Sequence, residues 1–355
     1  MLTYIVRRLL LAIPTLLFIA ACIFLLLNLA PNDPMAQVPM TIPPDVKEKM
    51  REALGLGQPL HVQFLKWVIQ FFWVEPQVFV DYLFNTSFSE GKQRIFSWQT
   101  RSPVMDIVVQ RLPQTLWVVG MSYIVGILIA LPIGIYSAYR QYSVFDQVGT
   151  FVTMVGYSVP PFFSGVFVIV LFSVQLGWLP SVYDTLHEVV DWETFKFQFR
   201  QMIMPVMVLA LQTTAQISRF MRSSMLDNLN QDYVRTARAK GLSEWTVVAI
   251  HVLRNSMIPV VTVIALGIPS IFGGAIITEQ VFKVNGIGQQ LINAIYANDL
   301  PTVQTITFMF AVLIVVFNLI ADILYGILDD VHELVSKWDK DKIINAYLEA
   351  PKKGF

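Results

Sequence analysis

Long stretches without a charged residue recur along the chain and dominate its pattern of hydrophobic and polar positions. There are six of them, at 9–30, 115–137, 150–178, 201–218, 255–278 and 301–321. A helix needs about 20 residues to cross the apolar part of a bilayer, so each run is close to a spanning length. In lipid the backbone must satisfy its own hydrogen bonds, which favours helices, and the period-2 alternation of a membrane barrel is absent. We predict an all-α polytopic membrane protein with six transmembrane helices.

The composition agrees with this fold class. Of 355 residues, 55% are hydrophobic and 14% are charged, whereas an ordinary soluble domain has roughly 25% charged residues. The formal net charge is zero, so no general attraction to nucleic acid is expected. Cys22 is the only cysteine and lies inside the first apolar run. We therefore expect no intrachain disulfide, no metal site and no nucleic-acid partner.

The distribution of Lys and Arg predicts the orientation of the chain. The first apolar run has 22 residues, longer than the roughly 7–15 residues of a signal peptide core, which indicates a retained anchor. With the N-terminus in the cytoplasm, short cytoplasmic segments hold nine basic residues and short outside loops hold three (Arg7, Arg8, Arg140, Arg219, Arg222, Arg235, Arg238, Lys240 and Arg254 against Lys196, Arg200 and Lys283). This bias favours cytoplasmic N- and C-termini.

Four segments follow from this topology. They are a cytoplasmic start with the first span at 1–30, an extracytoplasmic segment at 31–112, a five-helix core at 113–328 and a cytoplasmic tail at 329–355. Within the outside segment we expect a short helix at 45–54. We also expect two apolar stretches at 67–74 and 78–84, interrupted by Glu75-Pro76 and packed on the membrane or on neighbouring chains.

Prolines within the apolar runs predict kinks or helix ends, because proline lacks the backbone N–H that continues a helix. They are Pro160-Pro161, Pro205, Pro259 and Pro269.

A basic insert at 231–259 separates two apolar runs. Asp232 is a suitable N-cap for a helix that runs to Lys240, and Gly241 suits the left-handed residue that ends a helix. Ser243 can cap a second short helix, with Glu244 in its first turn. That second helix leads towards Pro259, where the next span is expected to begin. The insert is therefore predicted to be two helices joined at a glycine elbow.

The elbow combines positive charge with small side chains. Ala237 and Ala239 leave little bulk, so another protein can approach closely, and Arg235, Arg238 and Lys240 can pair with carboxylates of that protein. Arg254 can either pair similarly or anchor the second helix at the level of the lipid headgroups. A solvated, positive-inside loop would also explain the charge, but such a loop does not need two capped helices.

The insert resembles the EAA loop of binding-protein-dependent ABC importer permeases, in which Glu-Ala-Ala is followed by three residues and Gly. Here the motif falls on Arg235-Thr236-Ala237 and Gly241, with Asn255 to Pro259 at its end. Arg in place of Glu is typical of the B subunit of dipeptide and oligopeptide permeases, whose loops read RTARAKG…HxLRNxxxP. The resemblance places the coupling loop at about 226–256 and implies contact residues and supporting residues (Arg235, Thr236, Ala237, Arg238, Ala239, Lys240, Gly241 and Leu242; Asp232, His251, Arg254, Asn255 and Pro259).

The resemblance extends over nearly the whole chain. It includes the opening YIVRRLL, RLPQT before the second run, SVPPF in the third and EQVF followed by GIG late in the chain. Asn285 stands where proline is usual, Asp329-Asp330-Val331 replaces Asp-Pro-Arg, and extra residues occur around 71–101. These departures concern substrate and docking rather than the transporter class.

The resemblance implies a subunit that works in a larger assembly. Its expected partners are a second homologous permease, two ATP-binding subunits, an extracytoplasmic solute-binding protein and the lipid bilayer of a bacterial or archaeal plasma membrane. GxxxxGK[ST] is absent from this chain, so ATP and Mg²⁺ are expected on the partner ATPases, and no enzyme activity or cofactor is expected here. Motion of the elbow with its ATPase would drive alternating access of the membrane helices. We expect Gly241→Trp to abolish transport but not membrane insertion.

Asp322 follows the last apolar run. An acid at this depth is a functional candidate, but its place near the predicted cytoplasmic end favours a structural hydrogen bond over proton coupling.

Two other function classes compete with a peptide importer. An ion-driven secondary transporter would need ionisable groups within the spans and inverted repeats, and a scaffold or receptor would need no elbow. The same importer machinery could also carry a nickel complex, glutathione or an oligosaccharide.

Overall fold

The computed structural model describes residues 2–29, 43–45, 48, 57–273 and 275–323, and throughout these residues the regular elements are helices. The described part has no strand beyond an isolated bridge between Phe96 and Pro103. The helix expected at 45–54 lies largely outside the described residues.

Four helices are long and apolar enough to cross a membrane: Val6–Leu29, Val104–Tyr139, Glu244–Gly273 and Leu300–Ile323. A bent pair of helices raises the number to five if the pair is one span. The all-α membrane fold is therefore confirmed, whereas the count of six stays a prediction. The remaining run, 201–218, lies inside the 38-residue helix α9 (Trp192–Leu229), in which Gln201, Gln212 and Gln216 reduce the hydrophobicity.

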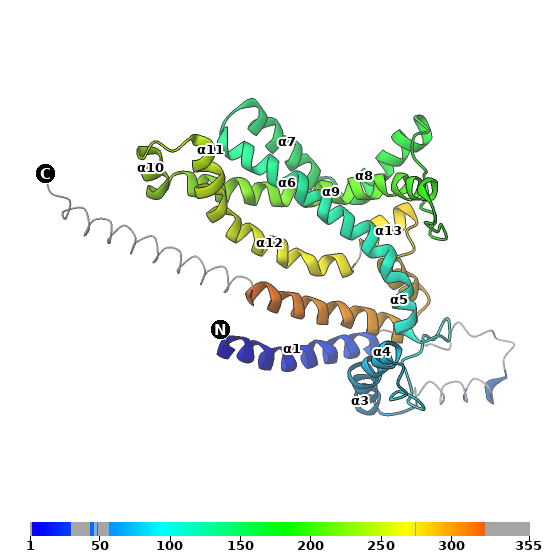
Figure 1. The fold of residues 1–355 in the computed structure, drawn as a ribbon. Coiled ribbons are helices and arrows are strands. Elements are labelled where there is room, and N and C mark those ends of the chain that lie inside the picture. Colours follow the sequence, from blue (N-terminus) through cyan, green and yellow to red (C-terminus); the bar gives the residue numbers. More distant parts are fainter. Residues whose placement is uncertain (1, 30–42, 46–47, 49–56, 274, 324–355) are drawn as a thin grey trace.

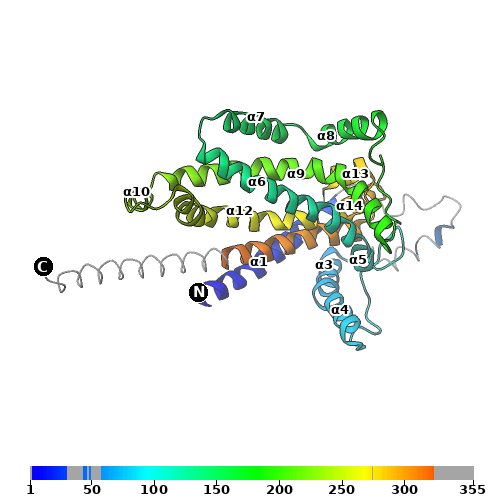
Figure 2. The same ribbon diagram turned by 45° about the horizontal axis from the view of Figure 1, so that its top comes forward.

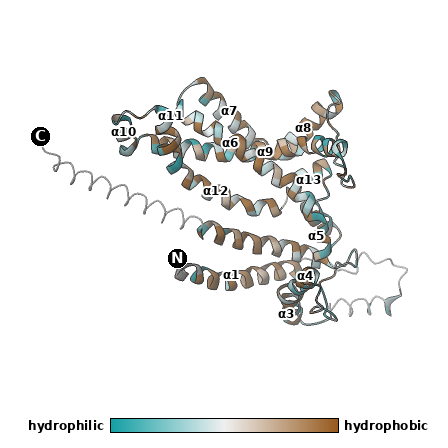
Figure 3. Cartoon of the chain, in the orientation of Figure 1, coloured by the Kyte–Doolittle hydropathy of each residue, from teal (hydrophilic) through white to brown (hydrophobic). Residues whose placement is uncertain are grey.

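The helices lie in successive layers. Figures 1 and 2 show α1 (Leu2–Leu29) beside Leu300–Ile323, then α12 (Leu253–Gly273), then α6 (Met121–Tyr139) with α9, and α7 (Val144–Ser158) on the far side. Figure 3 shows that α1, α12 and Leu300–Ile323 are largely hydrophobic along their lengths.

The run at 150–178 is not one straight helix, and its break lies at Pro160-Pro161, where the sequence predicts a kink or a helix end. Helix α7 ends at Ser158, and α8 (Pro161–Val168) with its π-helical continuation η3 (Ile169–Gln175) leaves at a bend of 103°. Two consecutive prolines remove two backbone donors, which explains the break.

The other prolines behave differently. Pro205 lies inside α9, and Pro259 and Pro269 lie inside α12. Of the two expected effects, kinks or helix ends, these three prolines do not end a helix, because neighbouring helices can support a backbone with a missing hydrogen bond.

The segment before the second span also departs from the prediction. Helix α3 (Leu60–Ile69), η1 (Gln70–Val74) and α4 (Glu75–Phe84) follow one another without a gap, so Glu75-Pro76 does not interrupt them. Pro76 lies directly after the π-helical turn η1, at the start of α4. Trp67 and Phe71 pack against Phe308, with ring centroids 5.1 and 5.0 Å apart. This face is therefore covered by the chain itself.

Helices α6 and α9 form the closest pair. Helix α6 continues from α5 (Val104–Thr115) and η2 (Leu116–Gly120). A Cβ added at Gly134 of α6 would lie 2.6 Å from Cβ of Met221 and 2.7 Å from the Ser218 carbonyl oxygen. Ala130, one turn earlier, is completely buried. Small residues on α6 thus allow direct backbone contact with α9, which is a common way for membrane helices to pack.

Candidate functional site

The basic insert is an elbow at the end of α9. It consists of α10 (Asp232–Ala239), α11 (Glu244–Thr246) and η4 (Val247–Val252). Gly241 has φ +77°, the left-handed conformation predicted for it, and Ser243 caps α11 by accepting a hydrogen bond from the Thr246 N–H at 3.3 Å. The N-cap of α10 is Gln231 rather than Asp232, which lies in the first turn, where a negative charge is still favourable.

The interior of the elbow is a small apolar core. Ala237 is 5% exposed and packs with Val234 in a cluster that includes residues of η4 and α9 (Val247, Val248, Val252, Met221 and Met225). Ala237 thus contacts the interior of the elbow, and the close approach of a partner that its small size would allow stays a prediction. Its small side chain lets α10 approach η4, whereas Ala239 is exposed.

A salt bridge joins the two arms of the elbow. The Arg238 Nη2 and Glu244 Oε1 atoms are 2.8 Å apart, and Nε donates to both carboxylate oxygens at 3.2 Å. Arg238 is thus paired within the chain, and its expected pairing with a carboxylate of another protein stays a prediction. Arg235 lies 3.5 Å from Asp232, and both are largely exposed, as is Lys240.

The outer surface of the elbow exposes large apolar groups beside these cations. Trp245 is 80% exposed, and Leu242 and Tyr233 are 41% and 37% exposed. Tyr233 donates a hydrogen bond to the Asn228 side-chain oxygen at 2.6 Å, which holds the ring at the end of α9. Tryptophan, tyrosine and arginine are enriched at protein-binding surfaces, so the exposed Trp245, Tyr233 and Arg235 fit such a surface.

The elbow is continuous with the helices that carry it. Residues Glu244–Gly273 form one helical stretch, so the second arm is the start of the span and the span does not begin at Pro259. Ser224 of α9 and Ser256 of α12 each donate a hydrogen bond to the other's carbonyl oxygen, at 2.9 and 3.2 Å. These two hydrogen bonds join α9 to α12, the helices on either side of the elbow.

A salt bridge joins α9 to the first turn of α7. Arg222 donates to both carboxylate oxygens of Asp146, at 2.6 and 2.7 Å, and the Asp146 side chain is 4% exposed. Sequence reasoning counted Arg222 as a loop cation and did not find this pair. The two residues are 76 positions apart, and no local signal in the sequence joins them.

Other residues expected to support the loop have few contacts of their own. Within the described part of the chain, no hydrogen bond or ion pair engages the side chains of His251, Arg254 or Asn255, while Thr236 donates to the Asp232 carbonyl oxygen at 3.0 Å.

Asp322 lies far from the elbow in sequence and pairs with Arg8 at 2.6 Å. That contact fits the structural role expected for Asp322.

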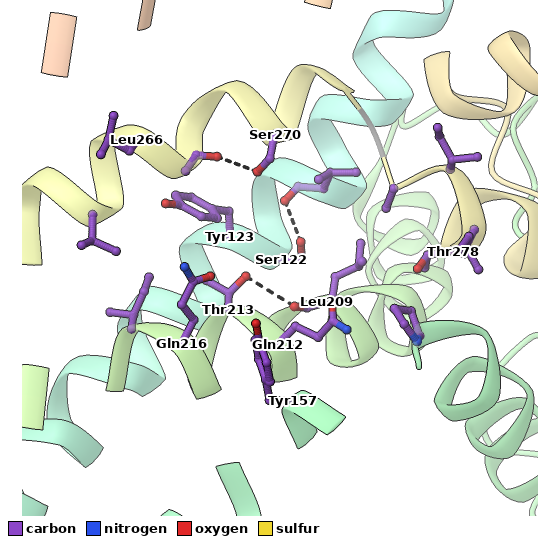
Figure 4. Close-up of a pocket in the computed structure, with 18 of the residues that line it drawn as sticks. Ser122, Tyr123, Tyr157, Leu209, Gln212, Thr213, Gln216, Leu266, Ser270 and Thr278 are labelled. Carbon is purple, nitrogen blue, oxygen red and sulfur yellow. Dashed lines mark hydrogen bonds between the residues drawn. The ribbon is translucent and has the colours of Figure 1, made fainter. Parts of the chain in front are cut away.

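A large open cavity lies further along the same helices. It has a volume of about 910 Å³ and is bounded by α6, α7, α9, α12 and the start of α13 (Ile276–Phe282). Figure 4 shows the polar groups of its lining, which are hydroxyl, phenol and amide groups (Ser122, Tyr123, Tyr157, Gln212, Thr213, Gln216, Ser270 and Thr278). Among the described residues that line it, none is charged.

One end of the cavity is fixed by a buried acid that the sequence motif contained without a stated role. Glu279 is completely buried and accepts hydrogen bonds from the Thr115 hydroxyl at 3.0 Å and the Gln289 N–H at 2.8 Å. Burial raises the pKa of the Glu279 carboxyl. The acid thereby joins α13 to α5 and to α14 (Ile287–Tyr296), which explains why EQVF and GIG occur together.

The helices, the elbow and the uncharged cavity suggest a subunit that moves solutes, and comparison with known proteins decides the family. Residues 130–330 match the family described as the inner membrane component of binding-protein-dependent transport systems, and residues 1–119 match its N-terminal counterpart. The chain belongs to this family. It is thus a permease subunit of an ABC importer, and the resemblance inferred from the elbow is confirmed.

Relatives cover almost the whole permease. The oligopeptide transport system permease protein AppB of Bacillus subtilis is 39% identical over 93% of this chain and 98% of its own length. A putative peptide transport system permease of Brucella suis is 34% identical over 92% and 97%. The glutathione transport system permease protein GsiC of Salmonella choleraesuis is 36% identical over the same shares.

A solved structure supports the fold. The MetNI methionine ABC transporter, in an inward-facing conformation, includes a chain that matches 64% of this permease over 98% of its own length. The TM-score is 0.50 at 17% identity, so this likeness concerns the fold alone. Several apolar helices together with the family place the permease in the inner membrane as a multi-pass protein.

Proposed function

We propose that this permease carries di- and oligopeptides as half of the membrane pathway of an ATP-driven importer. The cavity lined by α6, α9, α12 and α13 forms its part of the pathway. The observation that carries the proposal is the elbow, which exposes Trp245 while its second arm continues into α12 and its first arm follows directly after α9. The peptide substrate is supported by the peptide-permease names of the relatives.

The elbow couples this chain to a separate ATPase subunit. Trp245 and Leu242 enter a groove of the ATPase, and Arg235 and Lys240 lie at the rim. Exposed ion pairs contribute only about 0–1 kcal/mol each, so the apolar contacts dominate. Reversing a two-state gate from 1:99 to 99:1 needs about 5.5 kcal/mol of differential binding. The internal salt bridge and apolar core make the elbow stiff enough to transmit such a difference.

The assembly contains partners on both faces. Two ATP-binding subunits supply ATP and Mg²⁺, a second homologous permease completes the pathway, and an extracytoplasmic solute-binding protein delivers the solute. The orientation is with the elbow in the cytoplasm. Its support is that the start of α1, with Arg7 and Arg8, lies at the same end of the molecule as α10 (Figures 1 and 2).

The test is ATP-dependent peptide uptake into vesicles, together with co-purification of the ATPase subunits. Trp245→Ala should abolish both while the permease still inserts. Trp73→Ala is the matched control, because Trp73 is also largely exposed, at 64%, and lies on η1 away from the elbow. Normal uptake in the Trp245 variant would refute the docking role.

Gly241→Trp is a less decisive test than the sequence suggested. No atom lies within 4 Å of a Cβ added at Gly241, but its φ of +77° strains any side chain there. Lost transport in that variant would therefore not separate docking from damage to the turn.

Glutathione is a second candidate solute, because GsiC is a close relative in length and identity. Uptake of glutathione in preference to tripeptides would favour it.

A further inference from the structure

Two glutamines of α9 are the unengaged amide groups of the cavity. Gln212 and Gln216 both line it, and no hydrogen bond within the described chain engages either side chain. Gln212 is half-buried and Gln216 is exposed, so both side chains can be reached from the cavity. Figure 4 shows them on successive turns of α9.

Four of the hydroxyl groups around them already donate to backbone carbonyl oxygens of the cavity wall, whereas those of Tyr157 and Thr278 make no hydrogen bond within the described chain. Tyr123 donates to the Ile264 carbonyl oxygen, Ser122 to that of Val119 and Ser270 to that of Gly267, each at 2.6 Å. Thr213 donates to the Leu209 carbonyl oxygen at 3.4 Å. The wall thus offers a solute few free polar groups besides the two glutamines.

The spacing of the glutamines matches an extended peptide. Four helical residues rise about 6 Å, and residues i and i+2 of an extended chain are about 6.6 Å apart. A glutamine amide has both a donor and an acceptor, so it can pair with the N–H and C=O groups of a peptide backbone. A peptide that loses water on entering the cavity needs such partners.

We propose that Gln212 and Gln216 contact the backbone of a translocating peptide at alternate residues. This rests on the proposed function and specifies how the same cavity recognises its substrate class. The contacts recognise amide groups rather than side chains, and none of the described residues that line the cavity is charged, so peptides of different sequence are accepted. Both glutamines lie on the helix that carries the elbow, so they move with it.

The experiment measures ATP-dependent uptake by the full assembly with its solute-binding protein. Two substrates are compared, trialanine and the same molecule with one backbone N–H replaced by an ester oxygen. The ratio of their uptake rates contains a contribution from the binding protein, which is the same for every permease variant. Gln212→Met, Gln216→Met and the double variant remove the amides at similar volume. Gln147→Met, at an exposed position of α7 outside the cavity, is the matched control.

We expect the double variant to reduce the amide-to-ester ratio by about 3- to 10-fold, the effect of one or two lost hydrogen bonds, and the control to leave it unchanged. ATP hydrolysis and complex assembly in each variant show that the protein is folded. If the variants take up peptides with the wild-type ratio, the glutamine contacts are refuted while the proposed function stands. If the wild type shows no ATP-dependent peptide uptake, both are refuted.

Discussion

Replacing Gly134 with alanine tests the close packing of α6 on α9. The new Cβ would lie 2.6 Å from Cβ of Met221 and 2.7 Å from the Ser218 carbonyl oxygen, whereas carbon atoms in contact prefer about 3.5–4.0 Å. The two helices must therefore separate by roughly 1 Å. Overpacking of this kind costs about 1–3 kcal/mol. Alanine also gains up to about 1 kcal/mol of helix propensity over glycine, so the net expected loss is about 0–2 kcal/mol. The midpoint of thermal unfolding of the detergent-purified permease is the measurement.

Gly149→Ala is the matched control, because Gly149 is also in a helix. The nearest atom to its added Cβ is the Ser137 hydroxyl oxygen at 3.6 Å, an ordinary contact. Here the propensity gain has no steric cost, so the midpoint should rise or stay the same. If Gly134→Ala is as stable as Gly149→Ala, the α6–α9 contact is not the tight backbone packing described above.

Three further predictions concern buried or paired charges. Asp146→Asn leaves Arg222 without its carboxylate partner. Because the Arg222 side chain is 27% exposed and can partly reach water, we expect the unfolding free energy to fall by about 1–3 kcal/mol. Denaturation of the detergent-purified protein measures this loss, and an unchanged midpoint would contradict the prediction. Burial raises the pKa of Glu279 in the folded state, so the stability that its proton contributes is present at low pH and lost as pH rises through the raised pKa. As the pH is raised from about 5 to about 8, the unfolding midpoint of the wild type should therefore fall relative to that of Glu279→Gln. If the two midpoints depend on pH in the same way, this prediction is refuted. Asp322→Asn removes the partly exposed ion pair with Arg8 and should change the unfolding free energy by about 0–1 kcal/mol. The pH profile of uptake should stay that of the wild type, and a changed profile would indicate proton coupling.

The sequence by itself determined the fold class and the elbow. Runs of apolar residues become helices because lipid offers the backbone no other hydrogen-bond partner. Gly241 was identified as the turn residue because glycine tolerates a left-handed backbone, and its φ of +77° agrees. Ser243 was identified as a cap because its hydroxyl can reach the N–H groups of the first turn. These are local effects, set by residues within a few positions of one another.

Tertiary structure decided which side chains face the cavity and which residues pair. A helix that is apolar all round gives no sign of its inner face, because lipid and protein are equally apolar neighbours. Gln212 and Gln216 are polar positions within the run at 201–218, but only the packing of α9 shows that they line the cavity. The same holds for the inward turn of Ala237 and for the pairing of Asp146 with Arg222. Such contacts depend on how helices distant in sequence meet, and that arrangement is a property of the whole packed chain.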